Sequence, residues 1–145
     1  MRFKFKLLVV VKMLKKKLGI EAIEKDSWTL GVLSYSRIGL YFKIPPTLVI
    51  PDGCKWIGDW AFWRCKKLRK VVIPESVVEI RDFAFKECEK LKRVVADGLL
   101  ILKDYAFWGC RGLADLIIPV NVKSEDYAFS GCEKAEIKYR VKYKC

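Results

Sequence analysis

Four aspartates and four cysteines recur in this sequence at spacings that could support chemistry. Each Asp opens, and each Cys closes, a seven-residue pattern of Asp, an aromatic residue, Ala, Phe, two variable residues and Cys. The four copies run from Asp59 to Cys65, Asp82 to Cys88, Asp104 to Cys110 and Asp126 to Cys132. Paired carboxylates suggest glycoside hydrolysis, whereas grouped thiols suggest a metal site or disulfides.

The aspartates fit a structural role better than a catalytic one. If neighbouring coils of chain lie about 4.8 Å apart, adjacent carboxylates approach the separation of about 5 to 5.5 Å used by retaining glycosidases. A glycosidase pair, however, lies in a cleft with its two groups in different environments, whereas this ladder has four equivalent members. We therefore interpret each Asp as an N-cap that accepts the first free N–H groups of a short helical or 3₁₀ turn, and we predict no catalytic residue.

The cysteines are predicted to be free thiols that act as small core residues. Four of them would spread over about 14 Å, whereas four thiolates on one zinc each lie about 2.3 Å from the metal. Stacked side chains project in parallel, which keeps their Cβ atoms about 4.8 Å apart rather than at the preferred 3.8 Å or so of a disulfide. Because the chain has no histidine, Ser-His-Asp and Cys-His nucleophile pairs are excluded. We expect no metal and no cofactor.

The elements that must position these residues form a repeat. Consecutive signature cysteines are 23, 22 and 22 residues apart, and a period of about 20 to 29 residues is typical of a leucine-rich-repeat solenoid. Short alternating strands recur at the same period, at Leu48 to Ile50, Val71 to Ile73, Val94 to Ala96 and Leu116 to Ile118. The prediction is a β-rich fold, of the α/β class by convention, with right-handed coils of 22–23 residues, a parallel strand face and short helical or 3₁₀ turns on the convex side.

Two columns of aromatic residues follow from the same period. Phe62, Phe85, Phe107 and Phe129 are predicted to stack in the core, and Trp60, Phe83, Tyr105 and Tyr127 to stack half-exposed on the convex side. Such platforms can bind bases or sugars, but in a repeat protein an aromatic ladder is more often a structural element than a binding site. The fourth coil departs from the pattern, because Ser124 stands where an aliphatic residue belongs and Ala135 replaces the leucine.

The chain is expected to divide into three parts. Residues 1–46 are a basic N-terminal segment that we interpret as a cap, with a disordered tail as the alternative. Residues 47–136 form the solenoid of about four coils, and residues 137–145 form a capping strand that buries Ile137, Tyr139, Val141 and Tyr143. No apolar run is long enough to span a membrane, and the start of the chain matches a signal peptide poorly, because its apolar run is short and no cleavage site is evident. Unpaired cysteines slightly favour the cytoplasm.

The strand face provides the predicted partner-binding site. Its central residues form an aliphatic row flanked by charges, comprising Val49, Val72, Val95 and Ile117 with Arg69, Lys70, Lys92, Arg93 and Asp115. An exposed aliphatic stripe of this kind is suited to binding another protein or to self-association. The alternative is that β-propensity alone selects Val and Ile on a sheet surface.

A second functional hypothesis rests on charge. Lys and Arg number 29 against 17 Asp and Glu, which gives a net charge of +12. Residues 2–17 carry seven positive charges and no negative one, interleaved with Phe3 and Phe5. Such a segment could bind nucleic acid or an anionic membrane surface, although a solvated, solubilising cap explains the same run.

The full period resembles the BspA-like leucine-rich-repeat family. The resemblance is carried by Cys65-x-x-Leu68-x-x-Val71-x-Ile73-Pro74-x-Ser-Val77-x-x-Ile80-x-x-x-Ala84-Phe85-x-x-Cys88 and its neighbours, from about Thr47 to Ala135. It implies a curved solenoid without long helices that serves as a non-enzymatic binding module. Many members are similar in acting as adhesins on microbial surfaces, so the resemblance also implies a cell-surface or secreted location.

Overall fold

The computed structural model describes residues 46–50, 52 and 54–141. The basic segment that we interpreted as a cap lies outside these residues, except for Pro46. The same holds for Pro51, Gly53 and the last four residues of the chain.

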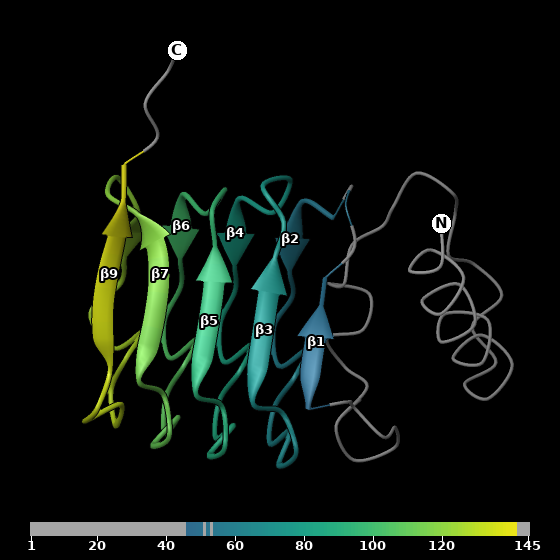
Figure 1. The fold of residues 1–145 in the computed structure, drawn as a ribbon, viewed down its shortest axis with the longest axis vertical. Coiled ribbons are helices and arrows are strands. Elements are labelled where there is room, and N and C mark those ends of the chain that lie inside the picture. The colour runs from purple at the N-terminus through teal and green to yellow at the C-terminus, as the bar shows by residue number, and fades with distance from the viewer. Residues whose placement is uncertain (1–45, 51, 53, 142–145) are drawn as a thin grey trace, which may run out of the picture.

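Two parallel sheets run along the two sides of the solenoid (Figure 1). The larger sheet, which we call the strand face, has five strands, β1 (Thr47–Val49), β3 (Lys70–Ile73), β5 (Arg93–Ala96), β7 (Asp115–Pro119) and β9 (Glu136–Arg140). Behind it lie four two-residue strands, β2 (Trp56–Ile57), β4 (Glu79–Ile80), β6 (Ile101–Leu102) and β8 (Lys123–Ser124). Strands alternate between the sheets, so each coil contributes one strand to each, as the predicted solenoid requires.

The strands stack in the register that the sequence period predicts. Val71 pairs with Val94, and Val94 pairs with Leu116, so equivalent residues of successive coils stand beside one another. Alternate residues of a strand point to opposite faces of a sheet. In β3 and β5 the first residue of the strand is exposed and the third is half-buried, whereas the second and fourth are buried. This pattern confirms the predicted alternation.

The core lies between the two sheets and consists of rows of equivalent residues that run from coil to coil along the solenoid. Leu68, Leu91 and Leu113 form one fully buried row, and Ile57, Ile80 and Leu102 form another. Within the described part of the chain, no polar or charged side chain is buried in this core. The second row ends at Ser124, which is exposed on β8, as expected for a degrading coil.

Two aromatic columns run through the coils, as predicted. The inner column has ring centroids 5.1 Å apart for Phe62 and Phe85, 5.2 Å for Phe85 and Phe107, and 6.0 Å for Phe107 and Phe129. Phe85 and Phe107 are fully buried. The outer column stacks at 4.2, 5.1 and 5.3 Å, from Trp60 through Phe83 and Tyr105 to Tyr127.

The short helical or 3₁₀ turns predicted at the signature are not confirmed, because the described residues form turns there but no helix. Their amide groups bond in two ways: Ala61 N donates to Gly58 O within the turn, whereas Phe62 N donates to Ala84 O of the next coil. Backbone carbonyls thus occupy the amides that an Asp59 N-cap would satisfy. Trp60 and Arg64 adopt the left-handed conformation, with φ of 59° and 56°, which bends the chain away from a helical path.

The burial predicted for the last strand is wrong. Ile137 and Tyr139 do lie in the inward-facing rows of the strand face, beside Leu116 and Ile118. They nevertheless remain 37% and 60% exposed, and Val141 is 54% exposed, because no described residue packs over the outer side of β9. The strand extends the sheet by one rung without covering its end.

Candidate partner-binding surface

The predicted aliphatic stripe is a continuous row on the strand face. Val49 pairs with Val72, Val72 with Val95, and Val95 with Ile117 in the ladder, so the four side chains stand on successive rungs. Val49 is 46% exposed, whereas the other three are half-buried by their neighbours on the sheet. The row therefore offers less accessible apolar area to a partner than a fully exposed stripe would, although all four side chains face away from the core.

A second row of charged residues lies beside the aliphatic one. Lys70 pairs with Arg93, and Arg93 with Asp115, two residues ahead of the aliphatic positions on each strand. Lys70 and Arg93 are exposed. Arg69 and Lys92 are exposed immediately before β3 and β5, and Lys92 N donates to Arg69 O. The structure thus places seven of the nine predicted residues in two rows on the strand face, and the other two, Arg69 and Lys92, directly before β3 and β5 at its edge.

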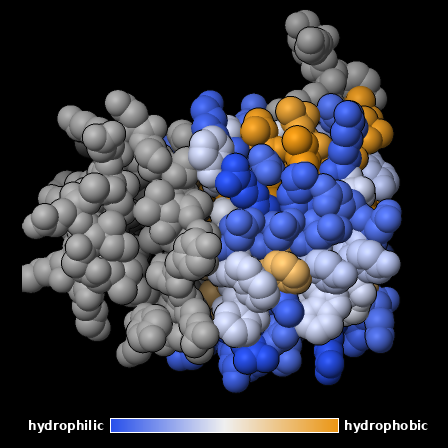
Figure 2. All heavy atoms as spheres, turned by 180° about the vertical axis from the view of Figure 1, so that it is seen from behind, coloured by the Kyte–Doolittle hydropathy of each residue, from blue (hydrophilic) through white to orange (hydrophobic). Residues whose placement is uncertain are grey.

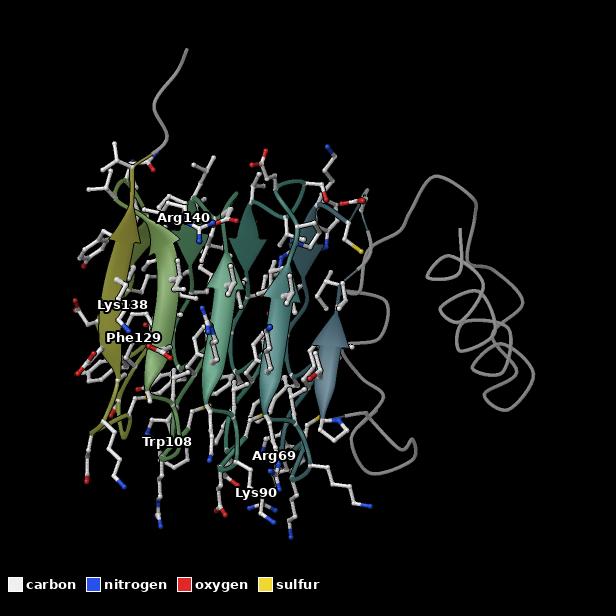
Figure 3. The ribbon with its side chains drawn as sticks, viewed as in Figure 1. Arg69, Lys90, Trp108, Phe129, Lys138 and Arg140 are labelled. Atoms are coloured by element: carbon white, nitrogen blue, oxygen red, sulfur yellow. The ribbon has the colours of Figure 1, made fainter. Side chains whose placement is uncertain are left out.

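Two outward-facing charged residues of β9 also belong to this face, although they were not among the nine residues of the predicted site. Lys138 pairs with Ile117 and continues the aliphatic row with a cation, and its Nζ donates to the carboxylate of Asp115. That hydrogen bond lowers the pKa of Asp115. Arg140 reaches across β7 to Asp97 (Figure 3). The repeat offers a signal that could have found them. A coil of 22 residues counted from Ile117 ends at Tyr139, one residue beyond its actual partner Lys138, because the last coil has one residue fewer.

Two aspartates of the ladder line a shallow acidic pocket beside the four-stranded sheet. Asp59, Asp82, Glu79 and Glu125 line a pocket of about 150 Å³ together with Arg81 and Lys103. Burial, with repulsion from Asp59 and Glu125, raises the pKa of Asp82. Lys103 donates to Glu125 at 2.8 Å, and that bond lowers the pKa of Glu125. The ladder is a set of mutually repelling carboxylates partly neutralised by two cations.

The signature thiols point at backbone oxygens of the neighbouring coil. Cys88 Sγ donates to Phe62 O at 3.0 Å, and Cys110 Sγ donates to Phe85 O at 3.1 Å. Burial raises the pKa of the Cys88 thiol well above its usual range. A buried thiol held in this way is a structural donor, because nucleophilic and metal-binding chemistry needs the thiolate.

The outer aromatic column has little free ring surface for a ligand. Phe83 is sandwiched between Trp60 and Tyr105, with interplanar angles of 18° and 6°. Lys86 lies over the rings of Trp60, Phe83 and Trp108 at 4.6 to 5.2 Å. Because a base or sugar stacks on a ring face, this column is a structural element rather than a binding platform.

An apolar groove lies at the upper edge of the solenoid, away from the predicted site. Leu100, Pro119, Val120 and Val141 line it, with a volume of about 310 Å³. Figure 2 shows apolar atoms gathered along this edge on the face opposite the five-stranded sheet. The Arg140 and Asp97 pair lies at its rim, so a polar contact already occupies one side of the groove.

The repeat and its stacking identify the family. A family model described as the BspA type leucine rich repeat region matches residues 44–144 in six copies. The chain belongs to the BspA-type leucine-rich-repeat family. The resemblance carried by the signature is thereby confirmed. Leucine-rich-repeat proteins are in general protein-interaction scaffolds without catalytic machinery, built from coils that present an extended surface.

Other comparisons add one solved relative of this BspA-type protein. No curated protein matches the sequence. The solved relative is a leucine rich cell surface protein from Faecalibacterium prausnitzii A2-165, whose crystal structure gives a TM-score of 0.46 at 30% sequence identity. The matched region covers 65% of this chain and 32% of the chain in that structure. This chain therefore spans about a third of the length of that protein. No helix in the described ranges has the length and hydropathy needed to cross a bilayer.

Proposed function

We propose that this protein is a non-enzymatic interaction module that binds another protein through its strand face. The partner contacts the aliphatic row of Val49, Val72, Val95 and Ile117 and the charges beside it. A sheet of five parallel strands offers a rigid surface whose side chains are held by the register, so little conformational entropy is lost when a partner binds. An adhesin-like role is the version of this function that the family resemblance favours.

One observation carries the proposal. Strands β1, β3, β5 and β7 stack without a shift of register, so Val72, Val95 and Ile117 form one unbroken apolar line on the outer side of the sheet. The exposed cations Lys70 and Arg93 follow the same line one row away. Apolar groups at the centre with charged groups at the rim are the arrangement found in protein interfaces.

The proposal is tested by placing charge in the aliphatic row. The double variant Val72→Glu and Val95→Glu adds two carboxylates to the strand face. We expect it to lose the partners that the wild-type protein captures from cell extracts and to lose any self-association, measured by quantitative proteomics and light scattering. Circular dichroism and the melting temperature should change little, because both side chains point away from the core.

A matched control separates the strand face from a general effect of charge. Val78 and Leu100 lie in the same two coils, are 37% and 45% exposed, and immediately precede β4 and β6 of the other sheet. The variant Val78→Glu and Leu100→Glu should capture the same proteins as the wild type. Equal capture by both double variants, or equal loss by both, would rule out the strand face as the binding surface.

A further inference from the structure

Positive charge is concentrated at one edge of the strand face and declines from coil to coil. The relevant positions are the two residues before and the two after the buried Leu that precedes β3, β5 and β7, and the corresponding residues around Ala135 before β9. In the first coil all four are cations, and in the second three are cations and one is an anion. The third coil has one of each, and the fourth has one cation and two anions. Figure 3 shows Arg69 and Lys90 of this set at the lower edge of the sheet.

The cations of the first two coils stand next to one another, and the nearest carboxylate on the same row is Asp115, which lies beside Arg93 and whose pKa is lowered mainly by Lys138 and in part by Arg93. Lys70 and Arg93 are Cα partners on adjacent rungs, so their side chains start about 4.8 Å apart. Arg69 and Lys92 are likewise joined through a backbone hydrogen bond of 2.8 Å. None of the four forms an ion pair with a residue in the described part of the chain. Like charges directly opposite each other destabilise a sheet.

The later coils show that such repulsion is avoided elsewhere on the same face. Asp115 occupies the third rung of the row that begins with Lys70 and Arg93, and it is bound by Lys138. Arg140, further along β9, binds both carboxylate oxygens of Asp97, at 2.7 and 2.8 Å. Lys138 and Arg140 thus form direct ion pairs within the fold, whereas the four cations of the first two coils form none among the described residues and remain available to a partner.

The chemistry beside these cations favours a polypeptide over a nucleic acid. Val72 and Val95 lie in the next row of the same strands, so anionic and apolar contacts are offered side by side. A nucleic acid would need ring faces on which its bases could stack. The rings of the outer aromatic column are already stacked on one another. An extended peptide with alternating acidic and apolar residues matches both rows, because its side chains alternate at a period of two.

We propose that the first two coils bind an acidic, extended protein segment, whose carboxylates contact Arg69, Lys70, Lys92 and Arg93 and whose apolar side chains contact Val72 and Val95. This inference rests on the proposed function, since it names the class of partner that the strand face takes. It also assigns the binding to the N-terminal half of the sheet, β1 to β5.

The test measures binding of fluorescent probes to the full chain by anisotropy. The probes are a short peptide in which glutamate alternates with valine, the same peptide with glutamine in place of glutamate, and single-stranded DNA of the same net charge as the acidic peptide. The variant Lys70→Gln and Arg93→Gln is compared with Lys123→Gln and Lys134→Gln, which removes the same charge from exposed positions outside the first two coils. A third variant, Val72→Thr and Val95→Thr, removes apolar contact while keeping shape.

The acidic peptide should bind the wild type and the Lys123 and Lys134 variant equally, and the Lys70 and Arg93 variant about fivefold or more weakly. The glutamine peptide should bind weakly to all. Equal weakening by both charge variants, or equally tight binding of the DNA, would overturn the acidic segment in favour of a general polyanion surface. Loss of peptide binding by the threonine variant alone would contradict the acidic segment but support binding at the strand face. Equal peptide binding by the wild type and all three variants would contradict both proposals.

Discussion

Arg140 Nη1 lies 2.7 Å from Asp97 Oδ1 and 2.8 Å from Asp97 Oδ2, so this pair joins β9 to the end of β5 across the intervening strand β7. The two residues are 43 positions apart in sequence, which is about two coils. The pair is one of the contacts that hold the last strand onto the solenoid through side chains, in addition to the backbone ladder with β7.

Arg140→Gln should destabilise the protein only slightly. The two side chains are 51% and 26% exposed, and exposed ion pairs contribute about 0 to 1 kcal/mol. We expect a loss of less than about 1 kcal/mol in the free energy of unfolding from urea denaturation. A double-mutant cycle with Asp97→Asn should give a coupling energy of the same size, and a coupling well above it would show that β9 depends on this pair.

The inner aromatic column should carry far more of the stability. Phe85 is fully buried, with Phe62 on one side and Phe107 on the other at 5.1 and 5.2 Å. Phe85→Ala should cost about 3 to 5 kcal/mol, enough to unfold a protein of marginal stability. Phe85→Leu keeps most of the apolar volume and loses two ring contacts of about 0.5 to 1.5 kcal/mol each. Tyr127→Ala, at the 54% exposed end of the outer column, is the control and should cost much less.

The aspartate ladder should make stability depend on pH in a predictable direction. Burial raises the pKa of Asp82 in the folded state, so its ionised form opposes folding at neutral pH. Asp82→Asn should therefore raise the melting temperature at pH 7, and the gain should vanish as the pH falls below about 4, where Asp82 is protonated in both states.

Asp115 provides the control of opposite sign. Its hydrogen bond with Lys138 lowers its folded-state pKa, so it contributes stability that is present above the unfolded-state pKa and is lost as the pH falls through the folded-state value. Asp115→Asn should lower the melting temperature at pH 7 and have little effect in acid. Shifts of the same sign for both variants would contradict the assignment of repulsion to the ladder and attraction to the strand face.

Two glycines should differ in how they respond to alanine. A Cβ on Gly98 would lie 2.0 Å from the backbone oxygen of Glu75, so Gly98→Ala forces two coils apart. Gly109 has φ of 70° but at least 3.5 Å of room for a Cβ, so Gly109→Ala costs only the left-handed conformation, about 1 to 2 kcal/mol. Thermal melts should rank Gly98→Ala as the more damaging change, and the reverse order would refute the close approach of the coils.

The sequence predicts the stacking of this fold because the same residue types recur at one period. The pairing of Val71 with Val94 and the column through Phe85 and Phe107 follow directly from that repeat. The conformation of the turn does not follow from it. Trp60 and Phe83 adopt positive φ, which bulky residues rarely do. The conformational free energy that this costs is offset by the stacking of their rings within the outer column. A propensity argument weighs only the residue itself, so it favoured a helical turn.

The candidate surface was predictable as a face but not in its exposure or its ion pairs. Val72 and Val95 are half-buried, because neighbouring side chains on adjacent rungs cover part of each. The ion pair of Lys138 with Asp115 depends on a last coil that is one residue shorter than the coil before it, which shifts the register read from the sequence alone. The repeat therefore predicts which side chains share a face, whereas the contacts between them depend on where each coil departs from the repeat.

Site-specific photo-crosslinking tests the central claim, that a partner protein binds the strand face, most directly. A photoreactive phenylalanine analogue is placed at position 72 on the strand face, or at position 100 beside the second sheet, and each protein is irradiated in the presence of captured partner. Crosslinks to the partner from position 72 and none from position 100 are the predicted result. Crosslinks from position 100 alone would show that the partner binds the opposite side of the solenoid.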